Sequence, residues 1–151
     1  MHGIRSIILI LILISSVNAQ EYIKETRNMS VSGSFEVTLA PQVDEGSPAG
    51  RMLISKQYSG ALNGWGKGQM LSKRTEKGAS VYAAIEEFTG TIDGKKGGFS
   101  LFHTGFMSQS SQELKVIVIE GSGSGELTGI TGQLFISQEG GAHHYRFEYH
   151  L

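Results

Sequence analysis

A glutamate and a histidine, Glu86 and His103, are the residues whose types and spacing most clearly suggest chemistry in this chain. Both lie in stretches of alternating residue types, and a period of two places every second side chain on one face of a strand. The two inward-facing sets read Tyr82, Ala84, Glu86 and Phe88, and then Phe99, Leu101 and His103. A hairpin that turns at Asp93-Gly94 places Ala84 opposite His103 and makes Glu86 and His103 a diagonal pair on one face.

Lys56 is expected to approach this pair, because the alternation of residues 51–58 also turns its side chain inward. A buried carboxylate needs such a partner or it takes up a proton. Two interpretations stay open. In one, Glu86 and His103 act as an acid/base pair with shifted pKa values. In the other, Glu86 and Lys56 form an internal structural ion pair, and the His and Tyr groups only find hydrogen-bond partners.

The predicted site follows from these faces. We predict Glu86 and His103 as catalytic residues. The predicted ligand-binding residues are Lys56, Tyr58, Tyr82, Phe99, His143, Tyr145 and Tyr149.

No metal or cofactor is expected. His143 and His144 resemble a metal-binding pair, but neighbours on a strand point to opposite faces. The glycine-rich run 121–125 lacks the Lys-Ser/Thr ending of a phosphate-binding loop and precedes a strand pattern, so we interpret it as a turn. Glu126, within the same region, fits either a turn residue or a functional carboxylate.

The last nine residues give the clearest indication of secondary structure. Residues 143–151 alternate large, mostly apolar side chains with charged or polar ones, which is typical of a half-buried β-strand. Seven further candidate strands precede it, at 31–39, 51–58, 65–72, 80–88, 98–105, 114–120 and 132–137. The chain has 21 Gly and only 2 Pro, which favours an all-β fold with tight turns.

Three similar glycine-containing segments, at 59–64, 89–94 and 124–129, connect alternate pairs of these strands. In an up-and-down meander every second connection lies at the same end, so the three segments are expected together. Closure removes exposed strand edges, so we predict an eight-stranded antiparallel up-and-down β-barrel, either filled by side chains or holding one small ligand. A two-sheet sandwich is the structural alternative. A membrane barrel is disfavoured, because the second face of the last strand carries charges.

The first 19 residues predict a secretory signal peptide, with Arg5 before an apolar run at 7–14 and Ala19 at the cleavage site. A tethered N-terminal helix is the alternative. Residues 20–151 would then form one barrel domain in the periplasm or outside the cell, without further membrane insertion. The chain has 13 Lys and Arg against 14 Asp and Glu, so a basic footprint for nucleic acid is missing. It has no Cys, so it can form no disulfide.

The order of several motifs resembles a bacterial family catalogued as domain of unknown function 3224. The motifs are 86–94, Gly98-Phe99 running to His103-Thr104-Gly105, 121–127, and the closing alternation from His143 to Leu151. The resemblance covers nearly the whole chain after the leader, and implies a small barrel similar to allene oxide cyclase. It maps recurring positions to Glu86, His103, Glu126, His143, Tyr145 and Tyr149. It implies no settled activity, and many members of the family start directly at the first strand, without a signal peptide.

Three hypotheses of function follow. The first is an exported barrel that binds a small apolar molecule among interior aromatic side chains, with Glu86 and His103 as a polar anchor. The second is a cofactor-independent isomerase or cyclase that uses the same pair for proton transfer. The third is an assembly module without a ligand, whose barrels pair as homo-oligomers through exposed faces. The sequence leaves open whether the protein is an enzyme.

Overall fold

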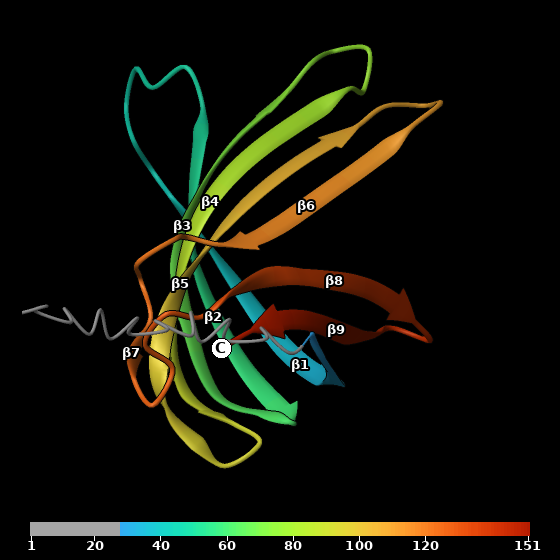
Figure 1. Cartoon of the computed structure of the whole chain (residues 1–151). Coiled ribbons are helices and arrows are strands. Elements are labelled where there is room, and N and C mark those ends of the chain that lie inside the picture. The colour runs from blue at the N-terminus through green and yellow to red at the C-terminus, as the bar shows by residue number, and fades with distance from the viewer. Residues whose placement is uncertain (1–27) are drawn as a thin grey trace, which may run out of the picture.

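The computed structural model describes residues 28–151, and within this range the regular structure is entirely β (Figure 1). The strands are β1 (Met29–Gln42), β2 (Gly50–Gly60), β3 (Leu62–Arg74), β4 (Ser80–Ile92), β5 (Lys95–Met107), β6 (Gln112–Val118), β7 (Ser124–Gly125), β8 (Thr131–Glu139) and β9 (Ala142–His150). The predicted signal peptide lies outside the described residues. No helix in the described range is long and apolar enough to cross a membrane.

The eight long strands form a closed antiparallel barrel, and β7 is a short extra strand. Neighbours in sequence pair from β1 to β6, β8 pairs with β9, and β9 returns to β1. The predicted up-and-down barrel is therefore confirmed, and the sandwich alternative is wrong. Most strands extend beyond the predicted limits, because ladder pairing continues into the polar residues that flank each apolar stretch.

The three glycine segments lie together at one end of the barrel, which we call the glycine end. The Asp93 amide donates a hydrogen bond to the Ala61 carbonyl, and the Glu126 amide donates to the Lys96 carbonyl. Asp93 and Gly94 form the β4–β5 turn with positive φ angles of 48° and 83°. Asp and Gly tolerate this left-handed conformation better than other residues, so the turn fixes the register of the β4–β5 hairpin.

β7 closes the glycine end. It pairs with Gly97 and Gly98 of β5, which lie nearer the glycine end than the segment of β5 that pairs with β6. Leu127 and Ile130, which follow β7, are completely buried. The run 121–125 is a turn region, as predicted, but its pairing with β5 and the apolar plug that follows it were not predicted.

Stacked aromatic rings fill the interior next to this plug. Phe88 lies 4.9 Å from Phe99, Phe99 lies 5.6 Å from Phe147, and Phe147 lies 5.1 Å from Tyr149, all between ring centroids. Each of the four is at most 2% exposed. This half of the barrel is packed like a protein core.

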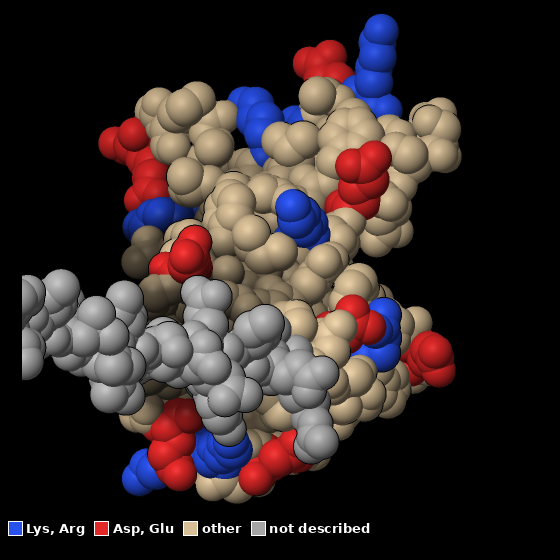
Figure 2. Space-filling model, viewed as in Figure 1, with Lys and Arg blue, Asp and Glu red and all other residues tan. Residues whose placement is uncertain are grey.

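The opposite end, which we call the loop end, carries the longer connections and is more open. β6 and β8 share one bridged residue pair, Ile117 with Gln133, and then run apart toward this end (Figure 1). The space-filling surface in the same view is indented at its right edge, between the loops above and β8 and β9 below (Figure 2). The barrel is therefore tightly closed at the glycine end and incompletely paired along one wall.

Candidate functional site

A buried cluster of polar side chains lies at the middle of the barrel, around Glu86 on β4. The carboxylate is completely buried. Lys56 Nζ donates to Glu86 Oε2 at 2.7 Å, and the Tyr58 hydroxyl donates to Oε1 at 2.8 Å. His103 Nε2 lies 3.0 Å from Oε2. The predicted approach of Lys56 to Glu86 and the predicted Glu86–His103 contact are confirmed; their functional roles remain predictions.

Register and small residues position this cluster. Ala84 pairs with His103 and Glu86 with Leu101, as the hairpin pattern predicted. Lys56 pairs with Gly66 on β3. A methyl group at Gly66 would come within 2.0 Å of Glu86 Oε1, so the absent side chain supplies the space that the carboxylate occupies. Gly66 was not among the predicted site residues, because its importance depends on a side-chain contact with the neighbouring strand β4.

The partners of Glu86 keep it ionised. Burial alone would raise the pKa of Glu86, but the contact with His103 and the positive charge of Lys56 more than offset this and lower it from 4.5 to about 2. Burial and the adjacent Glu86 charge raise the pKa of Tyr58 well above 10, so Tyr58 stays protonated and can donate. The cluster is therefore a compensated ion pair with a neutral phenol as its third member.

This shift predicts how stability depends on pH. The folded-state pKa is depressed, so the stabilisation is fully present above pH 4.5 and is lost as the pH falls toward 2. The loss attributable to Glu86 is about 3 kcal/mol. Urea unfolding at a series of pH values should show this decline. In Glu86→Gln the decline should be smaller by that amount, and equal slopes in the two proteins would contradict the prediction.

His103 faces Glu86 without an aligned hydrogen bond. Its Nε2 is one of two enclosed side-chain polar atoms in residues 28–151 that lack such a bond, the other being His150 Nδ1. The contact with Glu86 is therefore electrostatic, with the N–H directed off the line between the two atoms. No side-chain hydrogen bond among residues 28–151 involves His103 Nδ1, and the residue as a whole is 3% exposed.

His143 lies next to the cluster but is separated from it by Phe35. The His143 and Phe35 rings stack with centroids 5.1 Å apart, and Lys56 Nζ lies 4.8 Å from the Phe35 ring. An open pocket of about 590 Å³ adjoins His143, Phe35 and Val37 near the tip of the β8–β9 hairpin. His144 lines a different pocket, on the outer surface, so the two histidines face opposite sides as predicted.

The other predicted ligand-binding residues lie in three different places. Tyr82 is half-buried toward the loop end, with its ring across the space left by Gly105. Phe99 and Tyr149 belong to the packed aromatic core. Tyr145 closes the β2–β3 turn: its hydroxyl accepts the Leu62 amide at 2.7 Å and lies 3.3 Å from the Ser59 carbonyl oxygen, to which it donates. The structure thus brings Lys56 and Tyr58 to Glu86 and leaves Tyr82 and His143 as the more accessible members.

Glu126 takes a backbone role. Its carboxylate accepts the Lys96 amide at 2.8 Å, which fixes the loop of β7 to the start of β5. Of its two sequence interpretations, the structure favours the turn residue.

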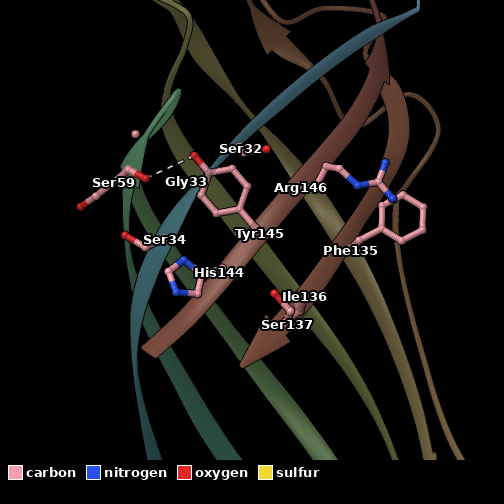
Figure 3. A pocket seen from close by; sticks show the side chains of 11 residues that line it. Ser32, Gly33, Ser34, Ser59, Phe135, Ile136, Ser137, His144, Tyr145 and Arg146 are labelled. Carbon is pink, nitrogen blue, oxygen red and sulfur yellow. Dashed lines mark hydrogen bonds between the residues drawn. The ribbon is translucent and has the colours of Figure 1, made fainter. Parts of the chain in front are cut away.

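A groove of about 730 Å³ crosses the outer surface of β1, β8 and β9 (Figure 3). Ser34 pairs with His144, and His144 pairs with Ser137, so the three lie in one row across the strands. In the next row, the Arg146 guanidinium lies 4.2 Å from the Phe135 ring and forms an ion pair with Glu148. The alternation of residues 143–151 predicted that His144, Arg146 and Glu148 share the polar face of the last strand, but not that this face borders a concave surface.

Comparisons with known proteins agree with this fold. A family model described as protein of unknown function (DUF3224) matches residues 31–149. The crystal structure of a DUF3224 protein with unknown function from Shewanella oneidensis MR-1 has a TM-score of 0.77 and 37% sequence identity to this chain. The match covers 82% of this chain and 96% of that one. No curated protein matches the chain. The chain therefore belongs to the DUF3224 family, whose function is unknown.

Proposed function

We propose that this protein is an exported barrel that binds a small, mostly apolar molecule at the loop end of its interior. The observation that carries the proposal is a set of inward-facing apolar side chains that stay partly exposed at this end. By strand alternation the set is Leu39, Met52, Met70, Tyr82, Met107 and Leu114. Apolar side chains on the inner face of a barrel normally pack against each other, so their exposure favours an occupant.

The polar cluster supplies an anchor beneath this apolar surface. Ala84 and His103 form one layer toward the loop end, and Glu86 lies one layer deeper. His103 Nδ1 is the cluster atom that we expect to meet a polar group of the ligand, since Glu86 is already satisfied by Lys56 and Tyr58. The divergence of β6 and β8 supports side access for an apolar molecule. The packed aromatic core limits the ligand to the loop half.

A pair of variants on β1 tests this proposal. Leu39 faces inward and is 47% exposed, and its neighbour Thr38 faces outward. Leu39→Glu should weaken binding of the neutral dye Nile red at least about tenfold, because a carboxylate would have to be buried by the apolar ligand. Thr38→Glu should leave binding unchanged. Equal dye affinity in both variants and the original protein, or no dye binding at all, would contradict the proposal. Native mass spectrometry of freshly purified protein should also reveal a co-purifying molecule.

A second candidate function, proton transfer in a cofactor-independent isomerase or cyclase, is favoured by the Glu86–His103 contact. A carboxylate facing Nε2 keeps the proton on that nitrogen and leaves Nδ1 as the basic atom. Glu86 itself is fully enclosed and strongly acidic, so His103 is the better base. The co-purified molecule serves as the substrate, and its conversion to product is followed in deuterated water. His103→Gln should abolish this conversion and should still bind the molecule. Conversion by His103→Gln at the original rate would exclude this role.

A further inference from the structure

The outer face of strands β3 to β6 is unusually apolar for a surface. Leu71, Val81, Ile85 and Phe106 are between 39% and 54% exposed. Phe102 and Ile117 lie beside them and are half-buried. The outer face of β1 and β9 is different, with Ser, Thr, Glu, His and Arg at the corresponding positions. An exposed apolar face on one side does not stabilise a monomeric barrel in water. Such a face is typical of an interaction surface.

Strand register makes this face one continuous patch of three rows. One row runs Gln69, Ile85, Phe102 and Ile117 across β3, β4, β5 and β6; the next runs Leu71, Ala83, Thr104 and Lys115; the third runs Lys73, Val81, Phe106 and Glu113. Cross-strand neighbours are about 5 Å apart, so the apolar side chains touch. A shallow pocket of about 560 Å³ lies over Ala83, with Leu71, Ile85 and Phe102 around it. The patch therefore has both raised and hollow parts.

We propose that this patch is the interface of a symmetric homodimer, in which it packs against the same patch of a second copy. A twofold axis that runs along the strands between β4 and β5 maps β4 onto β5 and β3 onto β6. Ile85 then faces the partner's Phe102, and Val81 faces the partner's Phe106. The small Ala83 faces the partner's Thr104. Such self-complementarity is what an isologous interface requires.

The charges at the edges of the patch agree with this axis. Lys73 on β3 and Glu113 on β6 stand at opposite ends of the same row, so the axis brings each Lys73 to the partner's Glu113. Lys73 Nζ already donates to the Pro48 carbonyl at 2.7 Å, but an ammonium group has three donors and can serve both partners. The same axis places Lys115 over the partner's Leu71, where its aliphatic stem can pack. An axis across the strands through the middle row would instead bring the two Lys115 ammonium groups together and place Glu113 against the partner's Ile117. The interface therefore selects the axis along the strands.

Charge exchange across the axis gives a specific test by sedimentation velocity. The purified protein should sediment at twice the mass of one chain at about 100 µM. Lys73→Glu alone and Glu113→Lys alone should each weaken self-association at least about tenfold, because each brings like charges together twice. An equimolar mixture of the two variants should dimerise again, since both contacts are then attractive. Ile85→Glu should weaken the dimer at least about a hundredfold, and Thr38→Glu on the opposite wall should leave it unchanged.

Several outcomes would overturn this proposal. A monomer at about 100 µM would do so, as would a dimer that survives Ile85→Glu. A mixture of Lys73→Glu and Glu113→Lys that stays monomeric would reject this axis. Flotation of the monomeric protein with phosphatidylcholine vesicles would assign the patch to a lipid surface instead. None of these results depends on ligand binding at the loop end, so the two proposals can fail separately.

Discussion

Glu86→Gln is expected to lower the free energy of unfolding by about 3–5 kcal/mol, because it removes the charge that compensates buried Lys56. Lys56 is 5% exposed, and its ammonium has Glu86 Oε2 and the Tyr58 hydroxyl as hydrogen-bond acceptors. The variant is isosteric, so the loss comes from charge rather than from a cavity. Urea unfolding at pH 7 measures it directly.

A second variant distinguishes loss of charge compensation from general damage. Lys56→Met together with Glu86→Gln removes both charges and keeps similar volumes, so the double variant should cost less than the sum of the two single variants. A coupling free energy of at least about 1 kcal/mol in this cycle is the expected result. Additive single effects would mean that the ion pair contributes nothing beyond its separate parts. The large expected effect on folding also means that Glu86→Gln alone cannot establish a catalytic role for Glu86.

Register explains why the sequence predicted the core of the site correctly. A two-residue Asp93-Gly94 turn allows only one antiparallel alignment of β4 and β5, and that alignment determines which residues oppose Glu86 and His103. Inward orientation of Lys56 follows from alternation alone. These features depend on local backbone geometry, and local geometry can be predicted from a residue pattern.

Packing explains what the sequence could not predict. Alternation shows that Phe99 and Tyr149 face inward, but not whether they line a cavity or fill it. The answer depends on Leu127 and Ile130, which reach the interior from an irregular loop after β7. The role of Tyr145 was equally unpredictable, since its hydroxyl forms a hydrogen bond with a turn that lies more than 80 residues earlier in the chain. Both are tertiary contacts without a periodic pattern.

The second large effect is expected at Gly66, because the buried cluster occupies the space where a side chain at this position would lie. Gly66→Ala places a methyl group 2.0 Å from Glu86 Oε1 and 3.1 Å from Tyr58 Cε2. Neither neighbour can move freely, since the carboxylate is held by Lys56 and Tyr58 in a packed interior. We expect the substitution to lower the free energy of unfolding by about 3 kcal/mol or more, as overpacking adds to the disruption of a buried ion pair. Thermal or urea unfolding is the measurement.

Gly50→Ala provides the matched control for this prediction. Gly50 begins β2, and a methyl group there would lie 3.6 Å from Ser72 Oγ, which is ordinary van der Waals contact. Alanine at a compatible position lowers the entropy of the unfolded chain, so this variant should be unchanged or more stable by about 0.4–1 kcal/mol. In a Glu86→Ala background the carboxylate is gone, and Gly66→Ala should then cost much less than in the original protein. If Gly66→Ala lowers the free energy of unfolding equally in both backgrounds, its effect arises in strand β3 itself. The space left by Gly66 would then not be what positions Glu86.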